Sequence, residues 1–522
     1  MTNTNDSVFN RAMVHEVNEF DQLRRFLMLG SESSMYTAGK DKTLTVASAP
    51  KVSALLQKSG VSVVNELVEV STSGRAAKQD PTLLVLAMAA RSADVEVRKA
   101  AFDAIPKICR TPTMLFSFID FYKAAGSTSG WGRLMRDAVS SWYNNKNLND
   151  LVYQVTKYAQ REGWSHRDVL RLSHPKPEND DRSKFYKWIV SKGEHKIDID
   201  AVEDKRAFTR LLAVEAAKLA PDASSIVPLI REFNLVHEHI PTNLQKDPSV
   251  WEALLEGMPL TALIRNLGRM TAYGLLTDTS DATKRAVEKL TNKVAIEKAR
   301  IHPFNVLVAL NTYQKGHGNL GSLTWKPVSK ISKALNELFY DSFMFVEPSN
   351  KRTCVALDVS GSMTWGDVNG SPGINPRLAS AAMAMATIRT EPNVTVMGFS
   401  HQLVEVDLKK TDTLETVVKK IESVPMGSTM CSLPMVWAAQ KKLAFDTFII
   451  YTDNETNSDR MSPAQALREY RQKMGIPARL IVVALAGHGR TIADPNDPGM
   501  LDVSGFDSAA PSVIAEFSRG VI

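Results

Sequence analysis

The sequence predicts a chain of two parts, an all-α stack of helices followed by a small doubly wound α/β domain. From Asp21 to about Phe345, apolar residues recur at three- and four-residue spacing and are interrupted at Pro, Gly and Asn, as in successive amphipathic helices. After Pro348, apolar runs rich in β-branched residues alternate with helical patterns, as βαβ units require. We therefore expect one domain over residues 1–350 and a second over residues 351–522.

The first part is predicted to consist of short helices joined by short connections. Clear helical patterns cover Thr82–Ser92, Asp94–Ile108, Leu134–Tyr143, Asn149–Gln160, Arg206–Leu219 and Trp251–Leu267. Strand patterns are nearly absent there. Such helices favour pairs stacked into an irregular solenoid, although the sequence shows no fixed repeat period.

The second part is predicted to hold a mostly parallel sheet covered by helices. The expected strands are Thr353–Val359, Val394–Phe399, Thr447–Thr452 and Leu480–Leu485. The expected helices are Arg377–Arg389, Thr413–Ile421, Leu433–Leu443, Pro463–Met474 and Ala509–Phe517. Sheets of this kind bind ligands beyond the carboxyl ends of their strands, so polar residues directly after the strands are expected to form a site.

The composition argues against several classes of protein. The 522 residues are 44% hydrophobic and 23% charged, the balance of a soluble globular chain. No segment approaches the roughly 20 apolar residues that cross a bilayer, and the opening residues do not resemble a secretory leader. Cys109, Cys354 and Cys431 lie in apolar contexts, which favours buried thiols over disulfides or zinc. We expect a cytoplasmic protein with no membrane partner.

The excess of positive charge lies in the first part. Residues 351–522 hold 17 Lys and Arg against 18 Asp and Glu, whereas residues 1–350 hold 46 against 39. An excess of this size indicates a polyanion partner only where it is clustered. The densest basic stretch contains Arg161, His166, Arg167, Arg171, His174 and Lys176, with Tyr158 and Trp164 in or beside it. Cations interleaved with aromatic rings favour RNA backbone contacts with some base stacking.

Oxygen-bearing side chains follow two predicted strands of the second part, and another lies in one of its loops. Asp358, Ser360 and Ser362 end the first strand, Thr429 lies in a loop before a helix, and Asp453 follows the strand Thr447–Thr452. Carboxylate and hydroxyl oxygens select hard cations. We therefore predict one divalent ion, Mg²⁺ or alternatively Mn²⁺, at this face of the sheet. The pattern resembles the metal-ion-dependent adhesion site (MIDAS) of von Willebrand factor A (vWA) domains, and this resemblance implies that Asp358, Ser360, Ser362, Thr429 and Asp453 are the ligands.

Longer segments extend the resemblance over the chain. In the first part they are Leu23–Gly30, Gly74–Pro81, Trp131–Arg133, Gly163–Asp168, Leu172–Lys176, Pro259–Gly268 and Arg300–Pro303. In the second part they are Thr452–Thr456, Ile492–Pro495 and Met500–Asp502. In this order they resemble the Ro autoantigen family, which joins a helical TROVE module to a vWA domain. The insertion Gly366–Asn375 and the C-terminus resemble bacterial or phage members more than animal ones.

The resemblance implies a fold and a function. It implies HEAT-like helical repeats closed into a monomeric ring around a basic hole, held shut by a Rossmann-like vWA domain. It implies a ribonucleoprotein that binds small non-coding Y RNA on the outer surface of the ring. The hole would admit single-stranded 3′ ends of misfolded RNA, in RNA quality control. It implies no catalysis, with a 3′ exoribonuclease as a further partner acting through the RNA.

The resemblance also assigns roles to single residues. Lys157, Arg161 and His174 match family positions that contact Y RNA, and Lys157 and Arg161, four apart, are expected to share a helix face. The residues expected to contact RNA in or near the hole are Arg133, Arg136, Arg265, Asn266, Arg269, Arg300 and His302. The chain departs from the family at Met430, where a carboxylate beside the Thr429 ligand is usual, which leaves the metal affinity open.

Three other functions are weighed against this one. A metal-dependent hydrolase needs a general base, and the metal motifs contain no His or Lys. A nucleotide-driven machine is suggested by the spacing Gly-x-Gly-x-x-Gly over Gly316–Gly321, but this segment follows a helical pattern and no P-loop lysine motif exists. The alternative that stays open is a metal-dependent adhesion or scaffold protein without RNA, and the basic first part argues against it.

Overall fold

The computed structural model describes residues 18–39, 44–74, 76, 78–126, 130–318, 321–453, 461–487 and 492–522. Two compact units emerge from the packing, unit 1 with residues 1–43 and 287–522, and unit 2 with residues 44–286. This division concerns packing and does not test the functional boundary at residue 350, which stays a prediction.

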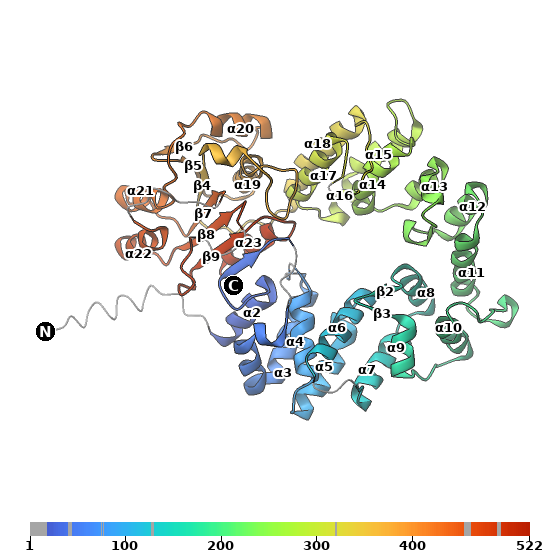
Figure 1. The fold of residues 1–522 in the computed structure, drawn as a ribbon. Helices are drawn as coiled ribbons and strands as arrows, with labels where there is room; N and C mark the ends of the chain where they lie inside the picture. The colour runs from blue at the N-terminus through green and yellow to red at the C-terminus, as the bar shows by residue number, and fades with distance from the viewer. Residues whose placement is uncertain are drawn as a thin grey trace. The chain divides into compact units, whose positions relative to one another are not determined.

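Unit 2 is helical (Figure 1). Its helices are α3 (Pro50–Thr72), α4 (Asp80–Ala90), α5 (Val95–Ile108), α6 (Pro112–Ala124), α7 (Arg133–Asn144), α8 (Leu148–Lys157), α9 (His166–Ser173), α10 (Asp180–Val190), α11 (Lys205–Leu219), α12 (Ala223–Phe233), α13 (Pro248–Gly257), α14 (Leu260–Ala272) and α15 (Asp281–Leu290), whose last turn belongs to unit 1. Short 3₁₀ turns cover Val46–Ser48, Ile199–Ala201, His237–His239 and Leu244–Lys246. Side-chain caps fix several helix starts, because Asp94, Asn147 and Asp222 each accept a hydrogen bond from a first-turn N–H.

Helices two apart in the chain pack against each other, α3 on α5, α4 on α6, α5 on α7 and α7 on α9. This stacking confirms the helical part of the predicted fold. One predicted helix, Trp251–Leu267, is wrong as a single element, since α13 ends at Gly257 and α14 begins at Leu260. Pro259 causes the break, because proline disfavours helical backbone at the residue before it, and Met258 is extended.

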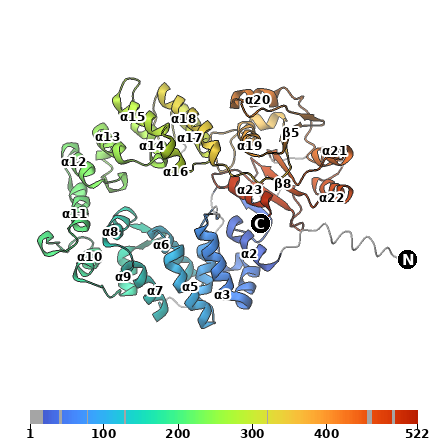
Figure 2. The ribbon, with the colours of Figure 1, turned by 180° about the vertical axis from the view of Figure 1, so that it is seen from behind.

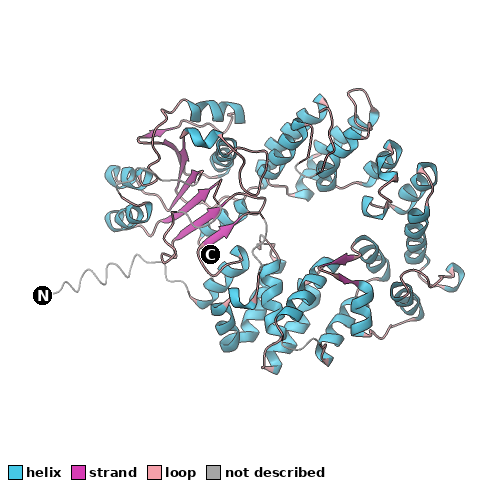
Figure 3. Ribbon diagram, viewed as in Figure 1, coloured by secondary structure: helices cyan, strands magenta, loops and turns pink. Residues whose placement is uncertain are grey.

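Unit 1 is built around a seven-stranded sheet (Figure 3). Its strands are β1 (Met35–Thr37), β4 (Thr353–Asp358), β5 (Val394–Phe399), β6 (Leu403–Glu405), β7 (Thr447–Thr452), β8 (Arg479–Ala484) and β9 (Met500–Ser504). The strand order is β1-β9-β8-β7-β4-β5-β6, and every neighbouring pair is parallel except β5 and β6. The sheet confirms the predicted α/β domain. The sequence patterns did not indicate β1, β6 or β9.

Helices cover both faces of this sheet (Figure 2). They are α19 (Pro376–Thr390), α20 (Leu414–Glu422), α21 (Leu433–Lys441), α22 (Pro463–Met474) and α23 (Ala510–Arg519). One face, carrying Ala356, Phe448, Ile450 and Val482, forms a core with α21 and α22. The alternate residues, such as Thr353 and Tyr451, face α19 and α23.

The remaining parts of unit 1 come from both ends of the chain. They are α2 (Glu19–Leu29), α16 (Lys293–Ala299), α17 (Pro303–Lys315), α18 (Ser329–Asp341) and 3₁₀ turns over Ser342–Phe345 and Gly361–Thr364. Strand β1 adds to the sheet edge beside β9, and the Tyr36 hydroxyl donates to Asp507 Oδ1 at 2.7 Å. Arg25 Nη2 donates to the carbonyl oxygen of Pro498 at 2.5 Å.

The three cysteines are buried thiols that form no disulfide, as predicted. Burial raises the pKa of Cys109 and Cys354. Within the described residues, no helix is long and apolar enough to cross a membrane.

Candidate RNA-binding surface and metal site

A tight β-hairpin interrupts the predicted basic helix face. Helix α8 ends at Lys157, and Gln160–Arg161 (β2) pairs antiparallel with Trp164–Ser165 (β3). The two turn residues, Glu162 and Gly163, have φ of 50° and 74°, the positive values of a two-residue I′ turn. The prediction that Lys157 and Arg161 share a helix face is therefore wrong. The glycine in the turn favours a hairpin over continuation of the helix.

Lys157 lies in a site formed by the protein itself. Its Nζ is 3.3 Å from the Tyr153 hydroxyl and 3.9 Å from Glu238 Oε1, and it lies over the rings of Tyr153 and Tyr158. Its side chain is 20% exposed. Burial lowers the pKa of Lys157, but the hydrogen bond to Tyr153 and the neighbouring acidic groups outweigh it and raise the pKa overall.

Arg161, in contrast, is exposed on the hairpin. Its Nε lies 3.2 Å from Oε1 of Glu162, whose side chain is exposed as well. The residue paired with it across the hairpin, Trp164, lies 6.3 Å from Trp131 between ring centroids, and Lys123 Nζ lies 5.9 Å from the Trp164 ring. The two half-buried indoles can stack against a base, and the cation beside them can bind its phosphate. The sequence analysis did not connect Trp131 and Lys123 with Trp164, because they lie on separate segments.

His166 is not part of this surface, which corrects its place in the basic stretch. It is 3% exposed and its ring lies 2.7 Å from the Tyr143 hydroxyl and 3.1 Å from the Tyr158 carbonyl. Burial lowers the pKa of His166 to about 3, so the ring is neutral at physiological pH. His166 therefore joins α9 to α7 and to the residue after α8.

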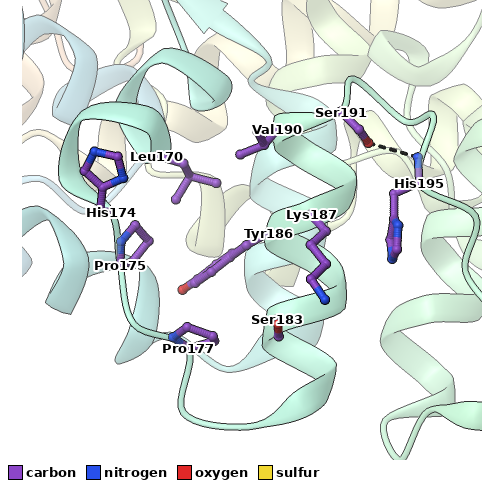
Figure 4. A pocket seen from close by; sticks show the side chains of 10 residues that line it. All are labelled: Leu170, His174, Pro175, Pro177, Ser183, Tyr186, Lys187, Val190, Ser191 and His195. Carbon is purple, nitrogen blue, oxygen red and sulfur yellow. Dashed lines mark hydrogen bonds between the residues drawn. The ribbon is translucent and has the colours of Figure 1, made fainter.

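His174 is exposed and ends α9 in a left-handed conformation with φ of 48°. It borders an open pocket of about 440 Å³ between α9 and α10 (Figure 4). Arg171 and Lys176 are also exposed, whereas Arg167 Nε donates to the Val190 carbonyl oxygen at 2.9 Å.

The residues predicted to contact single-stranded RNA fall in both units. Arg133 and Arg136 are exposed in the first turns of α7, and Arg133 Nε lies 3.6 Å from Asp137 Oδ2. On α14, Arg265 and Arg269 are exposed, and Arg269 lies 5.9 Å from the Trp251 ring. All four belong to unit 2.

Three others are placed differently. Asn266 is 6% exposed and its amide donates to the Ala262 carbonyl oxygen at 2.9 Å, so it faces its own unit. Arg300 and His302 belong to unit 1. Arg300 is exposed, whereas His302 caps α17 by accepting the Phe304 N–H at 3.1 Å and borders a small cavity beside Thr353 and Tyr451. Burial lowers the pKa of His302 to about 4.

The residues predicted to bind the metal lie where adjacent strands end. Asp358 is fully buried at the end of β4, and its Oδ1 accepts the Ser360 N–H at 2.8 Å. Its Oδ2 accepts from Thr452 Oγ1, at the end of the neighbouring strand β7, at 2.9 Å. The hydroxyls of Ser360 and Ser362 are 3.1 Å apart, and Asp453 directly follows β7. Thr452 is a residue that the sequence analysis missed, although its place before Asp453 was visible.

The loop with Thr429 borders the same turn. Thr429 is buried, and the next residue, Met430, donates its N–H to the Ser400 carbonyl oxygen at 3.2 Å. A Cβ built on Gly361 would lie 4.0 Å from Met426 Sδ, which places this loop against the turn after β4. The His401 ring fills the space beside Gly427, where a Cβ would lie 1.9 Å from Nδ1. A histidine therefore does lie beside this loop, although none lies in the motifs.

The donor set fits a hard divalent cation. Burial raises the pKa of Asp358, because the buried carboxylate loses the water that would solvate its charge. The hydrogen bonds from Ser360 and Thr452 act in the opposite direction and do not outweigh burial. A bound cation would stabilise the carboxylate in place of that water. Neutral hydroxyls make up most of the other oxygens, as Mg²⁺ and Mn²⁺ accept. No group of three or more His, Cys, Asp or Glu lies together in the described part of the chain, so a zinc-type ligand set is not found there.

The glycine-rich segment Gly316–Gly321 follows α17, as predicted, with Gly316 as the left-handed cap of that helix. Asn319 and Leu320 lie outside the described residues, as does most of the matched segment Thr452–Thr456. A helix before the motif, instead of a strand, does not fit a dinucleotide-binding turn.

Known proteins match both parts of the chain. Residues 8–237 and 232–315 match the TROVE domain, and residues 352–518 match the Ro60 vWA domain. The RNA-binding protein RO60 of Deinococcus radiodurans is 41% identical over 511 residues, covering 98% of this chain and 94% of that protein. The RNA-binding protein RO60 of Caenorhabditis elegans is 36% identical over 579 residues, covering 98% and 89%. The crystal structure of the Deinococcus radiodurans RO (RSR) protein superposes with a TM-score of 0.89 at 40% identity, covering 97% of this chain and 100% of that one.

Proposed function

This chain belongs to the Ro60 family, and from that premise we propose that it is an RNA-binding protein without catalytic activity. Two relatives whose similarity extends over nearly the whole chain are named RNA-binding proteins. The observation that carries the proposal is a group of exposed basic side chains from α7 to the segment after α9. They are Arg133, Arg136, Arg161, Arg171, His174 and Lys176. Those with acidic neighbours, Arg133 and Arg161, have exposed partners that a phosphate can replace at little cost.

The finer proposal divides this surface between two kinds of RNA. Structured small RNA of the Y type would bind at the hairpin and His174, where cations lie beside Trp164 and Trp131. Single-stranded 3′ ends of misfolded RNA would bind Arg133, Arg136, Arg265 and Arg269. RNA quality control, and a 3′ exoribonuclease acting on the bound RNA, follow from the same premise.

We also propose one divalent ion, Mg²⁺ or Mn²⁺, at Asp358, Ser360, Ser362, Thr429 and Asp453. The buried Asp358 carboxylate and the adjacent hydroxyls support it. Bound there, the ion would offer an open coordination position to an oxygen atom of a partner. Met430 supplies no carboxylate to this site.

The RNA proposal is tested by measuring affinity against salt concentration for a labelled hairpin and a labelled single strand. Arg161→Ala should weaken binding of the hairpin, and Arg133→Ala with Arg136→Ala should weaken binding of the single strand. Each lost phosphate contact should reduce the salt dependence by a slope of about one. Lys441→Ala with Lys473→Ala, exposed lysines of unit 1, serves as the control. A wild-type protein that binds neither RNA at low salt would disprove the proposal.

Absence of catalysis is tested separately, because His401 lies beside the Thr429 loop and could act as a general base. Labelled RNA incubated with the protein and Mn²⁺ should keep its length on a denaturing gel. Shortening that His401→Ala abolishes would instead identify a hydrolase.

A further inference from the structure

The pocket between α9 and α10 has apolar walls (Figure 4). Leu170 lies on α9, Pro175 and Pro177 lie on the segment that follows it, and Val190 ends α10. The ring of Tyr186 lies in the middle of the pocket, facing the two prolines. The volume of about 440 Å³ is in the range of small-molecule sites. Tyr186 and the two prolines offer flat, largely apolar ring surfaces, which suit a planar ligand.

Basic side chains line this pocket. His174, Lys187 and His195 line it, and none of its ten lining residues is Asp or Glu. Nearby cations are already bound within the protein, since Arg182 Nη1 donates to the Tyr143 carbonyl oxygen at 2.6 Å and Lys184 Nζ lies 2.6 Å from Asp180. Lys187 is exposed, and no ion pair to it occurs among the described residues. It is therefore available to an anionic ligand.

Hydrogen bonds hold the pocket walls in place. The Tyr186 hydroxyl donates to Asn144 Oδ1 at 2.7 Å, and the amide of Asn144 donates to the Lys176 carbonyl oxygen at 2.8 Å. On the other side, Ser191 Oγ accepts the His195 N–H at 2.9 Å and donates to the Trp188 carbonyl oxygen at 3.1 Å. Walls fixed before binding lower the entropy cost of taking up a ligand.

We propose that this pocket binds one unpaired nucleotide of a structured RNA. The base would lie against the prolines, Tyr186 and Val190, and a phosphate would meet Lys187. A nucleotide combines a planar, largely apolar face with negative charge, which an apolar pocket with basic residues only can recognise. The inference rests on the proposed RNA binding and assigns to it a site of its own, next to His174.

The test compares a hairpin RNA that carries one bulged nucleotide with the same hairpin fully paired. Val190→Trp fills the pocket, and Lys187→Ala removes its free cation. The matched controls are Leu172→Trp, an apolar residue of similar exposure outside the lining, and Lys196→Ala, an exposed lysine outside the lining. The unfolding midpoint of each variant shows that it is folded.

We expect the wild type to prefer the bulged hairpin, and each pocket variant to lose roughly fivefold or more in affinity for it. Affinity for the paired hairpin should change no more than in the controls. The inference is overturned if both variants keep the preference, or if the wild type binds both hairpins equally. A wild type that binds neither hairpin refutes the proposed RNA binding instead, so the two failures are distinguishable.

Discussion

At the scale of single residues, burial decides which predicted cations face solvent. Arg161 and Lys157 are four apart in sequence, yet Arg161 is exposed while Lys157 Nζ lies between Tyr153, Tyr158 and Glu238. His166 begins α9 and His174 follows its last residue, yet of these two histidines only His174 is exposed. Sequence alone does not separate these cases, because the partners of Lys157 and His166 include residues from other segments, such as Glu238 and Tyr143.

His166 gives a prediction about pH. The folded chain keeps this ring neutral down to its pKa of about 3, whereas the unfolded chain, at the ordinary value of 6.5, takes up a proton first. The contribution of His166 to the free energy of unfolding is therefore complete above pH 6.5 and falls as the pH drops from 6.5 towards 3. The loss is at most about 1.4 kcal/mol per pH unit.

His166→Gln should remove that part of the pH dependence, which urea unfolding at pH 7.5 and pH 5 would measure. At pH 7.5 the variant should have a lower free energy of unfolding than the wild type, and this difference in free energy should be smaller at pH 5. Burial also lowers the pKa values of His239 and His302 to about 4. Both histidines are present in the wild type and in the variant, so their contributions cancel when the two free energies of unfolding are subtracted. Equal differences at the two pH values would contradict the prediction.

At the scale of elements, the β2–β3 hairpin gives Arg161 its position. Gly163→Val should weaken binding of structured RNA although it removes no charge. A Cβ there meets no atom within 4 Å, so the whole cost, about 1–2 kcal/mol, comes from the positive φ of 74°. Gly130→Val, at a glycine without positive φ and with equal space, is the control. Unchanged RNA affinity in a folded Gly163→Val variant would show that the turn does not position Arg161.

Some strands and site residues could be predicted from the sequence, and others could not. Buried parallel strands leave long apolar runs, so Val394–Phe399 and Thr447–Thr452 were predicted with the observed bounds. Strand β1 has three residues and pairs with β9, far away in sequence, so no local pattern could indicate it. The carboxylates and hydroxyls after β4 and β7 were predictable because strand ends converge, whereas Thr452 and His401 depend on register and loop packing. The pocket between α9 and α10 had no sequence signal.

At the scale of the whole molecule, the residues proposed to bind the metal all belong to unit 1, and the exposed basic residues proposed to bind RNA belong to unit 2. A ligand that binds only the folded state stabilises the unit that holds it. With free Mn²⁺ at about 100 times its Kd, unit 1 should gain about 2.7 kcal/mol in its free energy of unfolding.

Calorimetric unfolding with and without Mn²⁺ would measure this gain. Asp358→Asn should abolish it, because the buried carboxylate is the central ligand of the proposed site. Glu469→Gln, which removes an exposed carboxylate of unit 1 outside the site, should retain it. An equal gain in wild type and Asp358→Asn would place the ion elsewhere.

The pairing of β1 with β9 has a consequence for how the protein is made. Met35 leaves the ribosome early, while its partner Asp502 is synthesised near the end of translation. At elongation rates of about 5–20 residues per second, the nascent strand waits roughly 20 to 90 seconds before it can pair. During that interval the stretch that becomes unit 2 emerges, while the first strand still lacks the partner strand β9.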